Sequence, residues 1–161
     1  MSLIHDGLPD LLRNLRKLQK KEILVGVPRD TSERKQTDVE EMNNATLAFI
    51  HEHGSPLANI PARPFIGPGI KRNKDKITKF LKKAGEAALT AGGRDKVEQQ
   101  LNLAGMAAQN GARAVINDGE GFQELAPSTI YQRQQRGRTG TKPLIDTGQL
   151  RNSITYVFKE D

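Results

Sequence analysis

The stretch PLIDTGQLRNSITYVF, residues 143–158, joins a turn to a strand near the end of the chain. Five of its last six residues, SITYVF, are β-branched or aromatic, a composition typical of a β-strand. An earlier run, ILVGVP at residues 23–28, predicts another strand, which Pro28 ends. The chain between these strands shows helical patterns and no alternation of strand and helix. The sequence therefore predicts an α+β fold.

Two amphipathic helices are predicted in the first third of the chain. Leucines at helical spacing indicate a helix from Leu8 to about Lys20. The next helix is predicted to open near Asp38, with Glu41 as its capping-box partner, and to end at Gly54. Its inward face is expected to consist of Met42, Ala45, Phe49 and Ile50.

Two further helices are predicted on either side of the AGG at residues 91–93. The glycines favour a break, although one continuous helix stays open. The first helix is marked by Ile77, Phe80, Leu81 and Ala84. The second is long and mostly alanine on its apolar side, which predicts close packing: Val97, Leu101, Ala104, Ala108, Ala112 and Val115. A short helix capped by Ser128 is expected to follow.

Length and composition predict one domain with a thin core. The 161 residues are expected to form a single domain over residues 1–161, with mobile loops near 29–38 and 132–142. Hydrophobic residues are 35% of the chain and aromatic residues only 4%. A thin core favours a protein whose partners supply part of the buried surface.

The net charge of +6 is concentrated in two places. Seven basic side chains fall within residues 71–83: Lys71, Arg72, Lys74, Lys76, Lys79, Lys82 and Lys83. Four more fall in a predicted loop: Arg133, Arg136, Arg138 and Lys142. Such clusters fit nucleic acid or an acidic protein surface, although a charged helix face in water has the same pattern.

The chain carries no signal for a membrane or an oxidising compartment. It has no cysteine, so neither disulfides nor thiolate metal sites are available. The apolar run ILVGV is too short to span a bilayer, and the first residues lack the pattern of a secretory signal. We therefore expect a soluble chain made in the cytoplasm, with no membrane partner.

The tripeptide Asp146-Thr147-Gly148 is the one that carries the catalytic carboxylate of aspartic proteases. Those enzymes need a second copy of the tripeptide and usually place a small residue where this chain has Gln149. A structural role accounts for more of the pattern, with Asp146 as a helix N-cap and Gln149 reaching back to it. We expect the tripeptide to cap a turn.

The segment HEHG, residues 51–54, raises the question of a metal site. The zincin pattern needs a histidine three residues after the glutamate, and this chain lacks it. The histidines fall near a predicted helix end, where the dipole favours them without a metal. The segment GPGIKRNK lacks the Gly-Lys-Ser/Thr ending of a phosphate loop. We therefore expect no metal, no cofactor and no enzymatic activity.

Three segments, in this order, resemble one family. They are ILVGVP, then LAFIHEHGSPLANIPARPFIGPGI, then LAPSTIYQRQQRG followed by KPLIDTGQLRNSITYVF. Together they resemble the neck and tail-completion proteins of long-tailed bacteriophages and prophages, the virion-morphogenesis group that joins heads to tails. The chain departs from that pattern at His53, where such proteins often carry an aromatic residue.

The resemblance implies a small antiparallel sheet with flanking helices and no catalysis. It implies a homo-oligomeric ring around the DNA passage, with six-fold symmetry expected, and other neck and tail proteins as partners. Non-specific contact with DNA in the channel is also expected. The location would be the virion, after assembly in the cytoplasm of the host bacterium.

The predicted assembly surface comprises the proline-rich segment NIPARPFIGPG and the turn at residues 146–151, because a rigid segment loses little entropy on docking. Arg63 is expected to form a salt bridge between or within subunits, or to cap a helix end. Phe65 and Ile66 are either docking anchors or core residues. The assembly candidates are Ile60, Arg63, Phe65, Ile66, Asp146, Gln149 and Arg151.

Two alternatives stay open. The chain could be a basic nucleic-acid-binding accessory protein with residues 71–83 along phosphates, although its few aromatic residues speak against stacking on single strands. It could also be a minor tail-tube or baseplate subunit.

Overall fold

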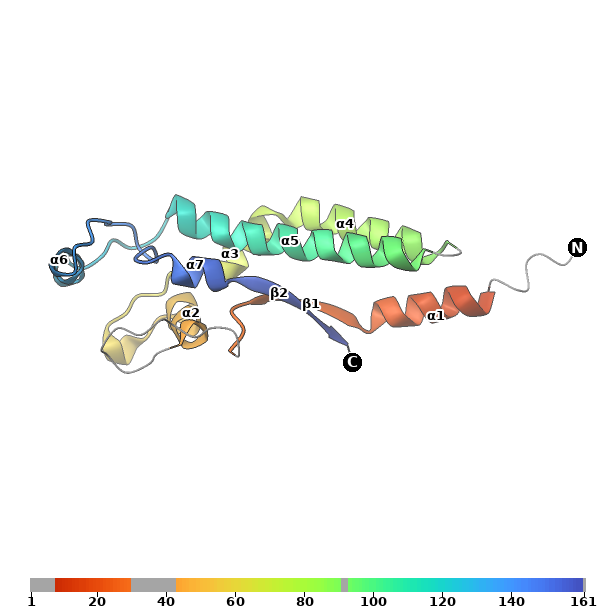
Figure 1. The fold of residues 1–161 in the computed structure, drawn as a ribbon, viewed down its shortest axis with the longest axis horizontal. Helices are drawn as coiled ribbons and strands as arrows, with labels where there is room; N and C mark the ends of the chain where they lie inside the picture. Colours follow the sequence, from red (N-terminus) through yellow and green to blue (C-terminus); the bar gives the residue numbers. More distant parts are fainter. Residues whose placement is uncertain (1–7, 30–42, 91–92, 161) are drawn as a thin grey trace, which may run out of the picture. The chain divides into compact units, whose positions relative to one another are not determined.

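The computed structural model describes residues 8–29, 43–90 and 93–160, and within them it shows a mostly helical α+β fold (Figure 1). The only sheet in this part of the chain has two antiparallel strands, β1 and β2. The predicted fold class is confirmed, including the long alanine-rich helix. The elements are α1 (Leu8–Gln19), β1 (Lys21–Gly26), α2 (Asn44–His53), the 3-10 helix η1 (Pro56–Ala58), α3 (Ile66–Arg72), α4 (Lys74–Ala88), α5 (Arg94–Asp118), α6 (Pro127–Gln135), α7 (Gln149–Ser153) and β2 (Thr155–Glu160).

The described residues group into two compact units. The first contains residues 8–24, 73–90, 93–108 and 156–160; the second contains the described residues between 25 and 72 together with residues 109–155. Helix α5 contributes residues to both. The single domain expected over residues 1–161 stays a prediction.

The first unit has a core made mostly of alanine. Helix α1 packs against α4 in this unit. Its buried side chains are Ala84, Ala88, Leu101, Ala104, Ala107 and Ala108. The Tyr156 hydroxyl at the start of β2 donates to Asn102 Oδ1 at 2.9 Å, which ties the strand to α5. The predicted alanine stripe is confirmed, and α4 and α5 are separate helices.

The second unit has the larger side chains at its centre. Its core cluster consists of Ala48, Phe65, Ala112, Ile116, Leu144, Leu150 and Ile154. Helix α2 packs against α7. Helices α3 and α5 approach so closely that a Cβ atom on Gly69 would lie 2.3 Å from the backbone nitrogen of Ala112. Only glycine fits between the two backbones at this point.

The start and the inward face of α2 differ from the prediction. The helix begins at Asn44, and the Asn43 side chain caps it by accepting from the Thr46 N–H at 2.8 Å. The expected cap residues Asp38 and Glu41, like Met42, lie outside the described residues. Phe49 was expected to face inward and is instead 65% exposed, because the small Ala48 one position earlier occupies the core.

Two more local predictions have outcomes. Ser128 does not cap α6: the N-cap position is Ala126, with no side-chain cap, and Pro127 supplies the helical φ at the first position. The predicted loop at 29–38 lies outside the described residues, apart from Arg29. Every helix in the described residues is too short or too polar to cross a membrane.

Candidate functional site

The segment after α2 folds back along that helix. Gly54 ends α2 with a φ of 79°, and its N–H donates to Ile50 O at 2.7 Å. A Cβ atom at Gly54 would lie 2.9 Å from the Ala62 nitrogen, so the returning chain requires glycine here. The Arg63 N–H then donates to His51 O at 2.7 Å, which fixes the proline-rich segment against α2.

Glu52 holds the start of α3. Its Oε2 accepts from the N–H groups of Phe65 at 2.7 Å and Ile66 at 3.0 Å, and its Oε1 accepts from Gly67 at 3.2 Å. The first N–H groups of a helix have no partner within the helix, and a carboxylate is favoured at this end. This interaction gives the glutamate of HEHG a structural role and joins it to the Pro-Phe segment thirteen residues later.

The geometry around Glu52 gives no support to a metal site. Both oxygens of its carboxylate accept from backbone N–H groups. His53 Nδ1 lies 3.1 Å from Phe49 O, one helical turn away. Among the residues whose positions are described, no three His, Asp or Glu side chains converge in a way that would hold a metal ion.

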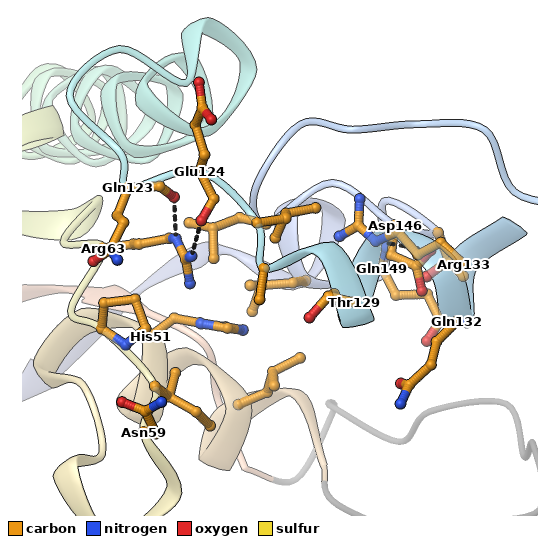
Figure 2. A pocket seen from close by; sticks show the side chains of 18 of the residues that line it. His51, Asn59, Arg63, Gln123, Glu124, Thr129, Gln132, Arg133, Asp146 and Gln149 are labelled. Carbon is orange, nitrogen blue, oxygen red and sulfur yellow. Dashed lines mark hydrogen bonds and ion pairs between the residues drawn. The ribbon is translucent and has the colours of Figure 1, made fainter.

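Arg63 ties two distant segments together. The residue is only 6% exposed. Its Nε donates to Gln123 O at 2.9 Å and its Nη2 donates to Glu124 O at 3.2 Å (Figure 2). Burial, and then the nearby Arg133, lower the pKa of Arg63 from its ordinary value. Within the described residues, the expectations of a salt bridge inside the subunit and of a helix C-cap are wrong, because Arg63 bonds loop carbonyls.

Asp146 pairs with arginines instead of capping a helix. Its Oδ2 forms an ion pair with Arg138 Nη1, and its Oδ1 lies 3.8 Å from Arg133 Nε. Helix α7 begins at Gln149 behind Gly148, with no side-chain cap. The predicted capping box of Asp146 and Gln149 is therefore wrong. A carboxylate gains more from charge-assisted bonds to guanidinium groups than from one neutral N–H.

Arg133 organises the loop between α6 and α7. Its Nη1 donates to the carbonyls of Gly140 at 2.9 Å, Lys142 at 3.0 Å and Ile145 at 3.0 Å. Its side chain is only 11% exposed. Arg133 thus lies in α6 and not in the predicted loop, and together with Arg138 and Lys142 it holds backbone and carboxylate groups within the unit. That the loop at 132–142 is mobile stays a prediction.

These segments surround an open cleft of about 900 Å³ within the second unit (Figure 2). Four of the predicted assembly residues line it: Ile60, Arg63, Asp146 and Gln149. The other lining side chains include Leu47, Leu125, Thr129, Gln132, Arg136, Leu144 and Leu150. Side chains from separate parts of the sequence therefore share one concave surface, the docking cleft.

The remaining predicted assembly residues lie elsewhere. Phe65 is fully buried in the core cluster, and Ile66 is half-buried against it, so the core alternative holds for both. Arg151 Nη1 donates to Asn117 Oδ1 at 2.9 Å, away from the cleft lining. Sequence reasoning missed Leu57 in η1, between the lining residues Pro56 and Asn59. Its side chain is fully exposed, at 104% of the reference area.

The basic side chains of residues 71–83 are all exposed. Lys71 and Arg72 belong to the second unit, where Arg72 forms an ion pair with Asp118 that raises the pKa of the arginine. The other basic residues of the run belong to the first unit: Lys74, Lys76, Lys79, Lys82 and Lys83. The cluster is thus divided between the units.

Comparison with known proteins finds one partial likeness. The chain is 43% identical over 49 residues to an uncharacterised protein of the archaeon Methanocaldococcus jannaschii. The matched segment is 30% of this chain and 36% of that protein, so the two share only part of their length. No family model and no solved structure matches the chain.

Proposed function

We propose that this chain is a structural protein of a bacteriophage or prophage virion, which completes the tail end or neck and helps to join tail to head. It would act by protein–protein docking in a homo-oligomeric ring, after assembly in the host cytoplasm. The convergence of Ile60, Arg63, Asp146 and Gln149 on the docking cleft carries the proposal. These residues come from two of the segments that resemble neck and tail-completion proteins.

The construction of the cleft suits docking. Pro56 and Pro61 line it, and η1 and an isolated bridge between Ser55 and Ile60 shape the segment around them. Two of its arginines, Arg63 and Arg133, are oriented by backbone carbonyls before any partner arrives. A preorganised surface loses little conformational entropy on binding, which favours affinity. The exposed Leu57 beside the cleft is one apolar side chain that a docking partner would cover.

A non-enzymatic role is part of the proposal. Asp146, the residue of the protease-like tripeptide, is paired with Arg138 and lies near Arg133. Glu52 is engaged by the N-terminus of α3. Both carboxylates thus have structural partners and no evident general acid or base role.

The test is a deletion of the gene in its parent phage or prophage, complemented with variants and followed by negative-stain electron microscopy. Deletion should leave full heads beside unattached tails. Wild-type protein should restore joining, whereas Leu57→Ser should restore it poorly without loss of folding, because that side chain has no packing to lose. Leu89→Ser changes another exposed leucine, in the first unit, and serves as the matched control.

Normal infectious particles after deletion would refute the joining role. Equal complementation by the two leucine variants would remove the surface beside the cleft from the docking site. Immunogold labelling on the tail tube or baseplate instead of the neck would favour the alternative of a minor subunit there.

Nucleic-acid binding is the second candidate, and one observation favours it. Lys76, Lys79 and Lys83 on α4 are exposed and spaced so that they share one side of the helix. A side of this kind can follow a phosphate backbone. Titration of DNA at several salt concentrations tests the idea, since phosphate contacts give an affinity that falls steeply with salt. Salt-independent or absent binding would refute it.

A further inference from the structure

The charges that line the docking cleft do not balance. Asp146 is matched by Arg138 and Arg133. Glu124 accepts from Arg63 only through its main-chain oxygen, and Figure 2 shows its carboxylate directed away from the guanidinium. In the part of the chain that the structure describes, no carboxylate pairs with Arg63. Within the described residues, the guanidinium is therefore a buried cation that no carboxylate pairs with.

The third nitrogen of the Arg63 guanidinium, Nη1, is available to bind an anion. Nε and Nη2 are engaged by two carbonyls, whereas Nη1 has no hydrogen-bond partner among the described residues. An arginine side chain has donors on all three nitrogens in one rigid plane. The two carbonyls thus hold the guanidinium group of Arg63 in a fixed orientation on the wall of the cleft. Burial and the repulsion from Arg133 both lower the pKa of Arg63, and an anion next to the guanidinium would offset this by favouring its charged form.

We infer that the docking cleft binds a carboxylate of an acidic, leucine-containing segment from a neighbouring virion protein, with Arg63 as its partner. This inference rests on the proposed function and names the chemistry of the docking partner. The apolar part of such a segment would contact the leucines of the lining, among them Leu47, Leu125 and Leu144. Arg136, exposed at the same cleft, would face a second acidic side chain.

The lining favours protein over nucleic acid. None of the described residues that line the cleft is a Phe, Tyr or Trp, the side chains that most often stack on bases. Leucine and proline side chains form much of the lining instead. The net charge of +6 favours a different, acidic protein as the occupant of this cleft, and the ring that we propose would form through other surfaces.

The experiment is a fluorescence-anisotropy titration of the full chain with two labelled peptides. One alternates leucine with glutamate; the other carries glutamine in place of each glutamate. The glutamate peptide should bind about 10-fold to 100-fold more tightly, the effect of hydrogen bonds to a charged group. Arg63→Lys keeps the positive charge but loses the planar guanidinium group, and should weaken binding of the glutamate peptide by about 10-fold. Lys96→Ala removes one exposed positive charge in the first unit and should leave the affinity unchanged.

A second measurement keeps the inference testable if Arg63 variants fail to fold. In the wild-type chain, the Nε–H signal of Arg63 in nitrogen-resolved NMR should shift on addition of the glutamate peptide and stay in place with the glutamine peptide. Equal affinity of the two peptides, or an unmoved Arg63 signal, would overturn the inference. Displacement of the glutamate peptide by stoichiometric duplex DNA would also overturn it, in favour of phosphate.

Sedimentation distinguishes the remaining occupant. A dimer that forms in the wild-type chain and is lost in Arg63→Lys would assign the cleft to a second copy and overturn the inference. The outcome is separable from that of the deletion experiment. Peptide binding by a protein whose deletion leaves normal particles would keep the carboxylate site and remove the virion role. Defective joining of heads and tails, combined with no peptide binding, would keep the virion role and remove the carboxylate site.

Discussion

Replacement of Glu52 should destabilise the second unit by an amount that its hydrogen bonds predict. Glu52→Ala removes the acceptor of three N–H groups; those of Phe65 and Ile66 are partly buried, whereas that of Gly67 is exposed. Water can replace the carboxylate only at the exposed group. Two stranded donors at about 1–1.5 kcal/mol each give a loss of roughly 2–3 kcal/mol. The lost charge at the start of α3 adds about 0.3–1 kcal/mol.

Urea denaturation followed by circular dichroism measures this loss as a lower midpoint. Glu52→Gln keeps one acceptor oxygen and should lose about half as much stability as Glu52→Ala. Glu86→Ala, on an exposed position of α4, is the control and should change stability by no more than about 0.5 kcal/mol. A Glu52→Ala protein as stable as this control would refute the structural role of the glutamate in HEHG.

Three further changes test other contacts. Gly69→Ala forces a Cβ atom against the backbone of α5 and should lower stability by about 1–3 kcal/mol. Gly85→Ala, with open space around its Cβ, should raise stability by about 0.5–1 kcal/mol. Thermal melts compare the two variants directly, and similar melting temperatures would contradict the close approach of α3 and α5. Asp146→Asn leaves partly buried guanidinium groups without a counter-charge and should lose about 1–3 kcal/mol in chemical denaturation, and an unchanged midpoint would argue against the ion pairs. Tyr156→Phe removes the bond to Asn102 and should lower stability by about 0.5–1.5 kcal/mol; a gain in the same assay would show that the bond contributes nothing.

Local patterns predicted most of the helices and both strands, because their signals lie within a few residues, but they did not predict η1 and α3. The alanine stripe of α5 repeats at helical spacing, and Ala104, Ala108 and Ala112 are buried as expected. The strand at the end of the chain follows from β-branched and aromatic residues. Gly54 ends α2 as predicted, with its N–H on Ile50 O. In each case the deciding interaction is between neighbours in the sequence.

Side-chain partners were harder to predict because the competing groups are distant. Asp146 has the spacing of a capping box, yet Arg138, eight residues earlier, takes its carboxylate. In the sequence Glu52 belongs to a histidine-rich turn, and only the folded chain places Phe65 next to it. Arg63 meets Gln123 across sixty residues. The only sequence signal for the contact between Glu52 and the start of α3 is that HEHG and the Pro-Phe segment occur in the same chain, thirteen residues apart.

Arg63, which is buried, and Arg133, which is only slightly exposed, differ in how their charges are compensated in the docking cleft. Arg133 holds three carbonyls and has Asp146 near its guanidinium, so its charge is compensated. Arg63 holds two carbonyls and has no such carboxylate among the described residues. A tie to two carbonyls needs N–H donors but no charge, and a neutral amide would supply donors with less desolvation. Among the described residues the charge of Arg63 has no carboxylate partner, and the docking segment that we propose would bring one.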